Sequence, residues 1–251
     1  MCLVNVNAFT VAVAALITAL ACGLGAVPFL FGPNALRGQL GVADAAAAGA
    51  MLAATTVLLG EGWGYGSLRL AVGVMLGIAF IAVTERVLAA HDEMDFGSLR
   101  GADARTAITI VAVMTVHSVA EGVGVGVSFS GGSELGIFIT AAIAIHCIPE
   151  GFAISLVLVP RGESVGRAAW WSIFSSLPQP LLAVPAFLFV DEFRGFLPVG
   201  LGFAGGAMAW LVAAELLPSA RRVASVQTVA AALAVSFAAM LALQLLLSRA
   251  T

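Results

Sequence analysis

Two copies of one short pattern, His-x-x-x-Glu-Gly, hold the residues of this sequence that are best suited to bind a metal ion. The first copy pairs His117 with Glu121, and the second pairs His146 with Glu150. In an α-helix, residues i and i+4 lie on one face about 6 Å apart along the axis, so each copy directs an imidazole and a carboxylate to the same side. Two such faces opposite each other would form a four-ligand cage for a cation.

The ligand types indicate which cation this cage would hold. Neutral imidazole and carboxylate together suit divalent transition metals, with Zn²⁺ expected first and Fe²⁺, Mn²⁺, Co²⁺ or Cd²⁺ after it, whereas Ca²⁺ and Mg²⁺ prefer all-oxygen sites. Both copies lie in strongly apolar stretches, where a glutamate is costly unless it has a partner. We therefore expect a metal ion as transported substrate, and no cofactor.

The composition places these motifs in a membrane. The chain is 61% hydrophobic and 10% charged, with a mean hydropathy of +1.07, whereas soluble proteins average about 45–50% apolar and 25% charged residues. Apolar runs of about 20 residues predict eight transmembrane helices, near 8–31, 43–61, 68–90, 105–128, 135–159, 167–190, 196–217 and 225–248. The first run is too long for the apolar core of a secretory signal, so we expect a retained helix.

Short connections leave no room for a separate soluble domain, so residues 1–251 are expected to form one all-α polytopic bundle. The longest polar connection covers about 91–104 and begins His91-Asp92-Glu93-Met94-Asp95. These side chains could collect metal on the cytoplasmic side. A solvated loop that marks the membrane boundary is the alternative.

The basic residues, all arginine, predict the orientation, because cytoplasmic loops carry the excess of positive charge. With the N-terminus outside, most of them face the cytoplasm: Arg37, Arg86, Arg100, Arg105, Arg161, Arg167, Arg221 and Arg222. Fewer lie outside: Arg69, Arg194 and Arg249. We predict a multi-pass protein of the cell (inner) membrane with both termini outside the cytoplasm. Lipid is an expected partner and nucleic acid is not, and a homodimer stays open.

Three further side chains within the spans are weaker candidates. Gln179 lies between Pro178 and Pro180, which lack an N–H and are expected to leave carbonyls such as that of Phe174 without a partner. Glu215 could act as a supporting acid or relay, and Met51 could be a thioether ligand or a packing residue. Glycines four residues apart, at 73 and 77, 122 and 126, and 202 and 206, predict close contacts between helices.

Taken together, these residues resemble the ZIP (Zrt/Irt-like) family of divalent-metal transporters, most closely its GufA-like branch. The two His-x-x-x-Glu-Gly copies match the family's fourth and fifth helices. Supporting segments cover nearly the whole chain, at 49–52, 84–86, 175–180, 205–208 and 215–218.

The resemblance implies a fold and a set of ligands. The fold would be an inverted repeat in a 3+2+3 arrangement, with helices four and five at its centre carrying the metal site. Zn²⁺ would pass into the cytoplasm by alternating access, held at mid-membrane by His117, Glu121, His146 and Glu150. The neighbouring second-metal positions would be Ser118, Cys147 and Gln179.

The sequence departs from the family at these second-metal positions. The family commonly has Asn or a carboxylate at Cys147, Asn at Ser118 and, in many members, Glu at Gln179. A site with less negative charge should bind a second cation more weakly, and a thiol would favour softer Zn²⁺ or Cd²⁺. The resulting hypothesis is one main transport site with a weakened auxiliary one.

Two other classes of function remain open from the residues alone. An intramembrane zinc metalloenzyme could use the same side chains to activate a water, but the sequence contains no His-Glu-x-x-His motif, and we predict that the chain is not an enzyme. A metal-independent proton or ion transporter could use His and Glu as a relay. A purely structural subunit would have no need for two glutamates in mid-membrane.

Overall fold

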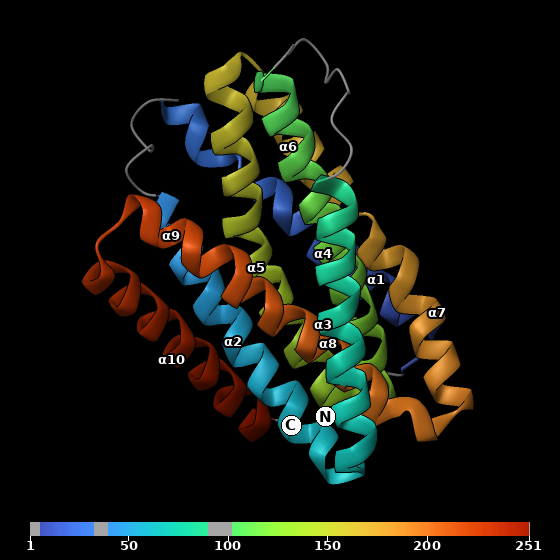
Figure 1. Ribbon diagram of the computed structural model, residues 1–251. Helices are drawn as coiled ribbons and strands as arrows, with labels where there is room; N and C mark the ends of the chain where they lie inside the picture. Colours follow the sequence, from blue (N-terminus) through green and yellow to red (C-terminus); the bar gives the residue numbers. More distant parts are fainter. Residues whose placement is uncertain (1–5, 33–39, 90–101, 251) are drawn as a thin grey trace.

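The computed structural model describes residues 6–32, 40–89 and 102–250, and within these ranges every regular element is a helix (Figure 1). The long helices are α1 (Ala8–Leu24), α2 (Leu40–Tyr65), α3 (Ser67–Ala89), α4 (Ala102–Gly131), α5 (Ser133–Leu158), α6 (Val165–Ser176), α7 (Pro178–Glu192), α8 (Leu197–Leu211) and α10 (Val226–Ala250). Shorter helical pieces are the 3₁₀ segments Val27–Phe31, Val159–Arg161 and Arg194–Phe196, the π-helical turn Val212–Leu216, and α9 (Leu217–Val223).

Eight helical stretches of the described chain are long and apolar enough to cross a membrane, which confirms the predicted number. They are Ala8–Phe31, Gly41–Tyr65, Ser67–Thr84, Val111–Gly131, Ser133–Arg161, Val165–Glu192, Arg194–Val223 and Val226–Leu246. Their order matches the predicted spans, with ends that differ by a few residues. The protein is therefore an integral, multi-pass membrane protein.

The sixth span is interrupted where the sequence places its proline pair. α6 ends at Ser176 and α7 begins at Pro178, so the two are separate helices joined at Leu177. Pro178 cannot donate to the carbonyl of Phe174, but the N–H of Leu177 donates to that oxygen over 3.2 Å. The expectation of an unpartnered carbonyl at Phe174 is thus wrong, because a tighter turn replaces the missing bond.

Contacts between helices in the first half of the chain have equivalents in the second half. α1 packs on α5 as α7 packs on α4; α2 packs on α10 as α8 packs on α3; and α2 packs on α5 as α8 packs on α4. This pattern is unchanged when the first three spans are exchanged with the last three and the fourth with the fifth. Equivalent spans are five apart in the outer sets and one apart in the central pair. Both numbers are odd, so equivalent spans cross the membrane in opposite directions. This is the expected inverted 3+2+3 repeat.

Glycines allow some of these helices to approach backbone to backbone. A Cβ atom built on Gly73 of α3 would lie 2.1 Å from the carbonyl oxygen of Val199, and one on Gly77 would lie 2.1 Å from that of Phe203. Neither distance is tolerable, so only glycine fits at this α3–α8 contact. The predicted role of these glycines is confirmed, and it follows from the need of membrane helices for close van der Waals packing.

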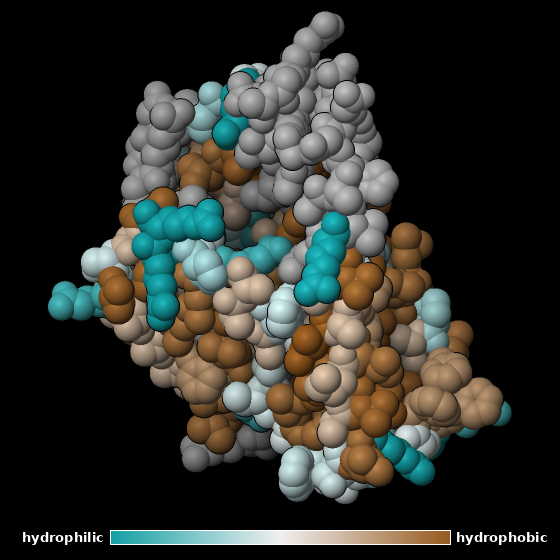
Figure 2. Space-filling view, in the orientation of Figure 1, coloured by the Kyte–Doolittle hydropathy of each residue, from teal (hydrophilic) through white to brown (hydrophobic). Residues whose placement is uncertain are grey.

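The outer surface is apolar over the middle of the bundle. Figure 2 shows brown, hydrophobic side chains over much of this face, with teal, hydrophilic groups gathered above them and at the lower rim. On α10, Val235 and Leu246 are 70% and 64% exposed. Exposed aliphatic side chains of this kind are suited to contact lipid, so the polar chemistry of the protein must lie inside the bundle.

Candidate metal centre

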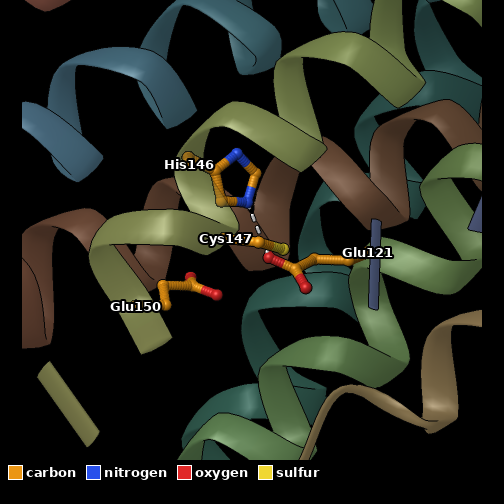
Figure 3. Close-up of side chains that lie close together, drawn as sticks. All are labelled: Glu121, His146, Cys147 and Glu150. Atoms are coloured by element: carbon orange, nitrogen blue, oxygen red, sulfur yellow. Dashed lines mark hydrogen bonds and ion pairs between the residues drawn. The ribbon is translucent and has the colours of Figure 1, made fainter. Parts of the chain in front are cut away.

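Four buried side chains from the two central helices converge inside the bundle. Glu121 comes from α4, and His146, Cys147 and Glu150 come from α5. Each offers one ligand atom, and these atoms all lie within 4.8 Å of one another. Figure 3 shows the carboxylates of Glu121 and Glu150 and the ring of His146 grouped around Cys147. The set contains nitrogen, oxygen and sulfur donors, which divalent transition metals accept.

Both oxygens of Glu121 are held by neighbours from other helices. His146 Nε2 lies 2.7 Å from Glu121 Oε1, and Gln179 Nε2 donates to Glu121 Oε2 over 2.6 Å. Such contacts fix the carboxylate in one orientation and help to offset the cost of burying its charge. Glu121 is consequently a carboxylate with partners at both oxygens.

Glu150 and His146, in contrast, each retain an unused polar atom. Glu150 is 5% exposed and His146 is fully buried, and neither Glu150 Oε1 nor His146 Nδ1 has a hydrogen-bond partner among the described residues. A buried acceptor without a partner costs free energy. A cation bound between the carboxylates would compensate Glu150, so the arrangement is suited to receive a positive charge.

His117 and Met51 lie beside this group rather than within it. They line a narrow gap that they share with Glu121 and that is too small to admit a water-sized sphere. His117 Nδ1 lies 2.5 Å from the carbonyl oxygen of Val113, so Nδ1 carries the proton and Nε2 keeps the lone pair that a metal would use. Of the four predicted ligands, Glu121, His146 and Glu150 thus lie together in the four-residue group. The ligand role of His117 stays a prediction.

Gln179 connects the centre to a third and a fourth helix. Besides Glu121, its amide nitrogen donates to Cys147 Sγ over 3.4 Å, and its oxygen accepts a hydrogen bond from Thr18 of α1. Gln179 is fully buried, so all of these contacts are made away from water. Thr18 was not anticipated from the sequence, where a single threonine in an apolar run carries no signal of its own.

The remaining predicted residues are Ser118, Glu215 and His91, which are not members of the four-residue group. Ser118 is buried in α4, and its ligand role stays a prediction. Glu215 is half-buried in the π-helical turn Val212–Leu216. His91 belongs to residues 90–101, which lie outside the described residues.

The glycine that ends each copy of the motif is explained by the neighbouring helix. A Cβ on Gly122 would lie 2.6 Å from the carbonyl oxygen of Gln179, and a Cβ on Gly151 would lie 1.7 Å from that of Cys22. α7 therefore crosses α4 directly beside Glu121, while α1 crosses α5 directly beside Glu150. The two crossings are equivalent under the inverted repeat, and each brings a second helix to the metal-binding face.

Comparison with known proteins agrees with this architecture. No family model matches the chain. A protein of Arabidopsis thaliana named as a zinc transporter is 47% identical over 246 residues, which cover 96% of this chain and 39% of that protein. The zinc transporter GufA of Myxococcus xanthus is 31% identical over 228 residues, which cover 84% of this chain and 88% of GufA. The chain belongs to the ZIP family.

These relatives differ in how much of their own length aligns with this ZIP chain. The chain spans well under half of the Arabidopsis protein but most of GufA. The zinc transporter ZIPB of Bordetella bronchiseptica is 30% identical over 67% of this chain and 53% of ZIPB. The eight-span bundle is thus comparable in extent to GufA, while the other two proteins contain additional sequence.

Proposed function

We propose that this protein carries Zn²⁺ across a membrane and that Glu121, His146 and Glu150 bind the ion during passage. The observation that supports this most directly is the convergence of two carboxylates and an imidazole at the centre of an inverted-repeat membrane bundle. Sites between inverted repeats are suited to alternating access, because one half can move against the other around a fixed centre. The names of the relatives, all zinc transporters, support zinc as cargo.

The chemistry of the centre fits a carrier better than a permanent metal site. The two carboxylates can neutralise a divalent cation, and carboxylate and imidazole ligands exchange more readily than a cage of four thiolates would. Inward movement, toward the cytoplasm, is proposed from what the resemblance to the ZIP family implies. The arginine distribution supports the proposed orientation, with both termini outside the cytoplasm.

The test is zinc entry into proteoliposomes that contain a trapped zinc-sensitive dye. We expect saturable flux with the wild type, and a fall of more than roughly tenfold for His146→Ala and for Glu150→Ala, because each removes a ligand. Glu134→Gln is the matched control, since Glu134 is an exposed glutamate in the first turn of the same helix. Wild-type flux no faster than through protein-free liposomes would contradict the proposal.

The same experiment separates the carrier from its two alternatives. A proton or ion relay predicts flux that does not depend on zinc and that collapses a pH gradient when zinc is absent. An intramembrane hydrolase predicts tight zinc binding without zinc movement, as well as an open position for water at the metal. The transporter names of the relatives favour the carrier over the enzyme.

We expect the wild type to bind one zinc ion tightly. The Gln179→Glu variant should bind a second zinc ion tightly as well. The Gln179 amide nitrogen lies between Glu121 Oε2 and Cys147 Sγ, so a carboxylate there would supply the charge that the auxiliary position lacks. Without metal, the added acid would repel Glu121 and lower the melting temperature, and zinc should restore it. The measurement is a zinc titration of the purified protein in detergent. Gln227→Glu, at an exposed glutamine of α10, is the control variant. Two tightly bound zinc ions in the wild type would refute the prediction.

A further inference from the structure

A threonine of the first span contacts the candidate metal centre through the side chain of Gln179. Thr18 Oγ1 of α1 is hydrogen-bonded to Gln179 Oε1, and Gln179 Nε2 donates to Glu121 Oε2 over 2.6 Å. Thr18 and Gln179 are fully buried, and Glu121 is 1% exposed. Buried polar groups depend on one another for hydrogen bonds, so each of these three side chains is oriented by its neighbours in the series.

The neighbours of Gln179 decide which end of its amide group faces the centre. On the side of the centre lie Glu121 Oε2 and, 3.4 Å from the amide nitrogen, Cys147 Sγ. A carboxylate accepts from an amide nitrogen, whereas it repels an amide oxygen, which has no proton to donate. The nitrogen therefore faces the centre. The amide oxygen consequently faces Thr18, on the opposite side.

The Thr18 hydroxyl has one proton and two acceptors within reach. Besides Gln179 Oε1, its oxygen lies 2.7 Å from the carbonyl oxygen of Ala15. That carbonyl belongs to the interior of α1, where the backbone N–H four residues later is its regular partner. The Gln179 oxygen belongs to a side chain and has no such regular partner. Two oxygens in contact without a proton between them would repel, so we expect the Thr18 proton to be donated to Gln179.

We propose that Thr18 is a positioning residue of the zinc carrier, which holds the Gln179 amide group in place and thereby orients the Glu121 carboxylate for the incoming ion. This inference rests on the proposed transport function and adds a residue of α1 to it. Without the hydroxyl, Gln179 Oε1 would be a buried acceptor without its donor, and the amide group could turn away from Glu121. Partners behind a metal ligand fix its orientation, and their loss lowers metal affinity.

The experiment is a double-mutant cycle on zinc uptake by proteoliposomes, with Thr18→Val, Gln179→Leu and the variant that carries both. Valine has nearly the shape of threonine without its hydroxyl. We expect each single substitution to raise the half-saturating zinc concentration by roughly tenfold or more, and to change the maximal rate less. The double variant should match Gln179→Leu to within about twofold, because Thr18 acts through Gln179.

Two controls separate positioning from simple packing. Thr18→Ser keeps the hydroxyl and should retain most of the zinc affinity. Thr56 of α2 also donates to the carbonyl three residues earlier, that of Ala53, over 2.7 Å, so Thr56→Val removes the same kind of local bond away from Gln179. It should leave zinc uptake unchanged. Thr18→Ala repeats the test if valine disturbs folding.

The outcomes distinguish this inference from the proposed function. Wild-type half-saturation in Thr18→Val or in Gln179→Leu overturns the positioning role and leaves the carrier intact. The same follows if Thr18→Val causes an equal loss with and without Gln179, since that result indicates packing alone. Absence of zinc flux in the wild type overturns the carrier. The same cycle, measured as zinc affinity of the full chain in detergent, then supports Thr18 if the two losses are coupled and overturns it if they add.

Discussion

Glu121→Gln should reduce saturable zinc flux by roughly 100-fold or more, the largest effect on transport that we expect from a single substitution. Glu121 is the residue at which α4, α5 and α7 meet, because one oxygen faces His146 and the other accepts from Gln179. Glutamine has the same shape, but its amide nitrogen would face either the His146 nitrogen or the Gln179 amide group. The variant therefore loses a charge and also loses one of its two contacts.

Two comparisons make the result specific to the carboxylate. Glu121→Asp keeps the charge on a shorter side chain and should retain part of the flux. Glu192→Gln changes an exposed glutamate at the end of α7 and should leave the flux unchanged. Measurement of initial zinc uptake at several zinc concentrations gives the maximal rate and the half-saturating concentration. Near-normal uptake by Glu121→Gln would show that the ion passes elsewhere.

Gly151→Ala should produce the largest loss of stability. Its Cβ would lie 1.7 Å from the carbonyl oxygen of Cys22, and because the obstacle is backbone rather than a flexible side chain, α1 and α5 would have to separate. Overpacking of this kind costs about 3 kcal/mol, the upper part of the usual range. Thermal unfolding of the purified protein in detergent measures the change, and the variant should also lose zinc binding, since Glu150 is the adjacent residue.

The glycines of the chain provide a graded series for this test. Gly122→Ala places a Cβ 2.6 Å from the Gln179 carbonyl oxygen and should be less damaging than Gly151→Ala. Gly60 lies in α2 with nothing within 4 Å of its added Cβ, so Gly60→Ala should be neutral or raise the melting temperature, because alanine favours a helix more than glycine does. Equal melting temperatures for all three variants would mean that the helices do not cross as described.

The spans of this protein could be predicted from the sequence because hydrophobicity and length are local properties. A run of about 20 apolar residues must be helical in a membrane wherever it packs, and the described part of the chain contains eight such helices. The ends were less predictable: α4 extends from Ala102 to Gly131, beyond the expected 105–128. The π-helical turn Val212–Leu216 was also unforeseen, because it depends on a bond from Leu217 N–H to the Val212 carbonyl that no residue type specifies.

Part of the candidate site could likewise be predicted from the sequence, and part depends on how the helices pack. The spacing within each motif was sufficient to place Glu150 on the same helix face as His146, since both lie within one turn of α5. It could not reveal that Glu121 contacts His146 of the other motif, because that contact depends on how α4 and α5 cross. The same reason explains why His117 lies beside Met51 in a neighbouring gap.

By itself, the sequence determined that this is an eight-span membrane protein with two buried His–Glu pairs, because periodicity and apolar length act within single helices. Only the tertiary structure decided which side chains share the centre. Gln179 reaches it from α7 and is contacted by Thr18 of α1, and glycines at 122 and 151 leave room for the backbones of these two helices. Contacts between helices far apart in the sequence arise from packing, and no local pattern of residues predicts which helices pack together.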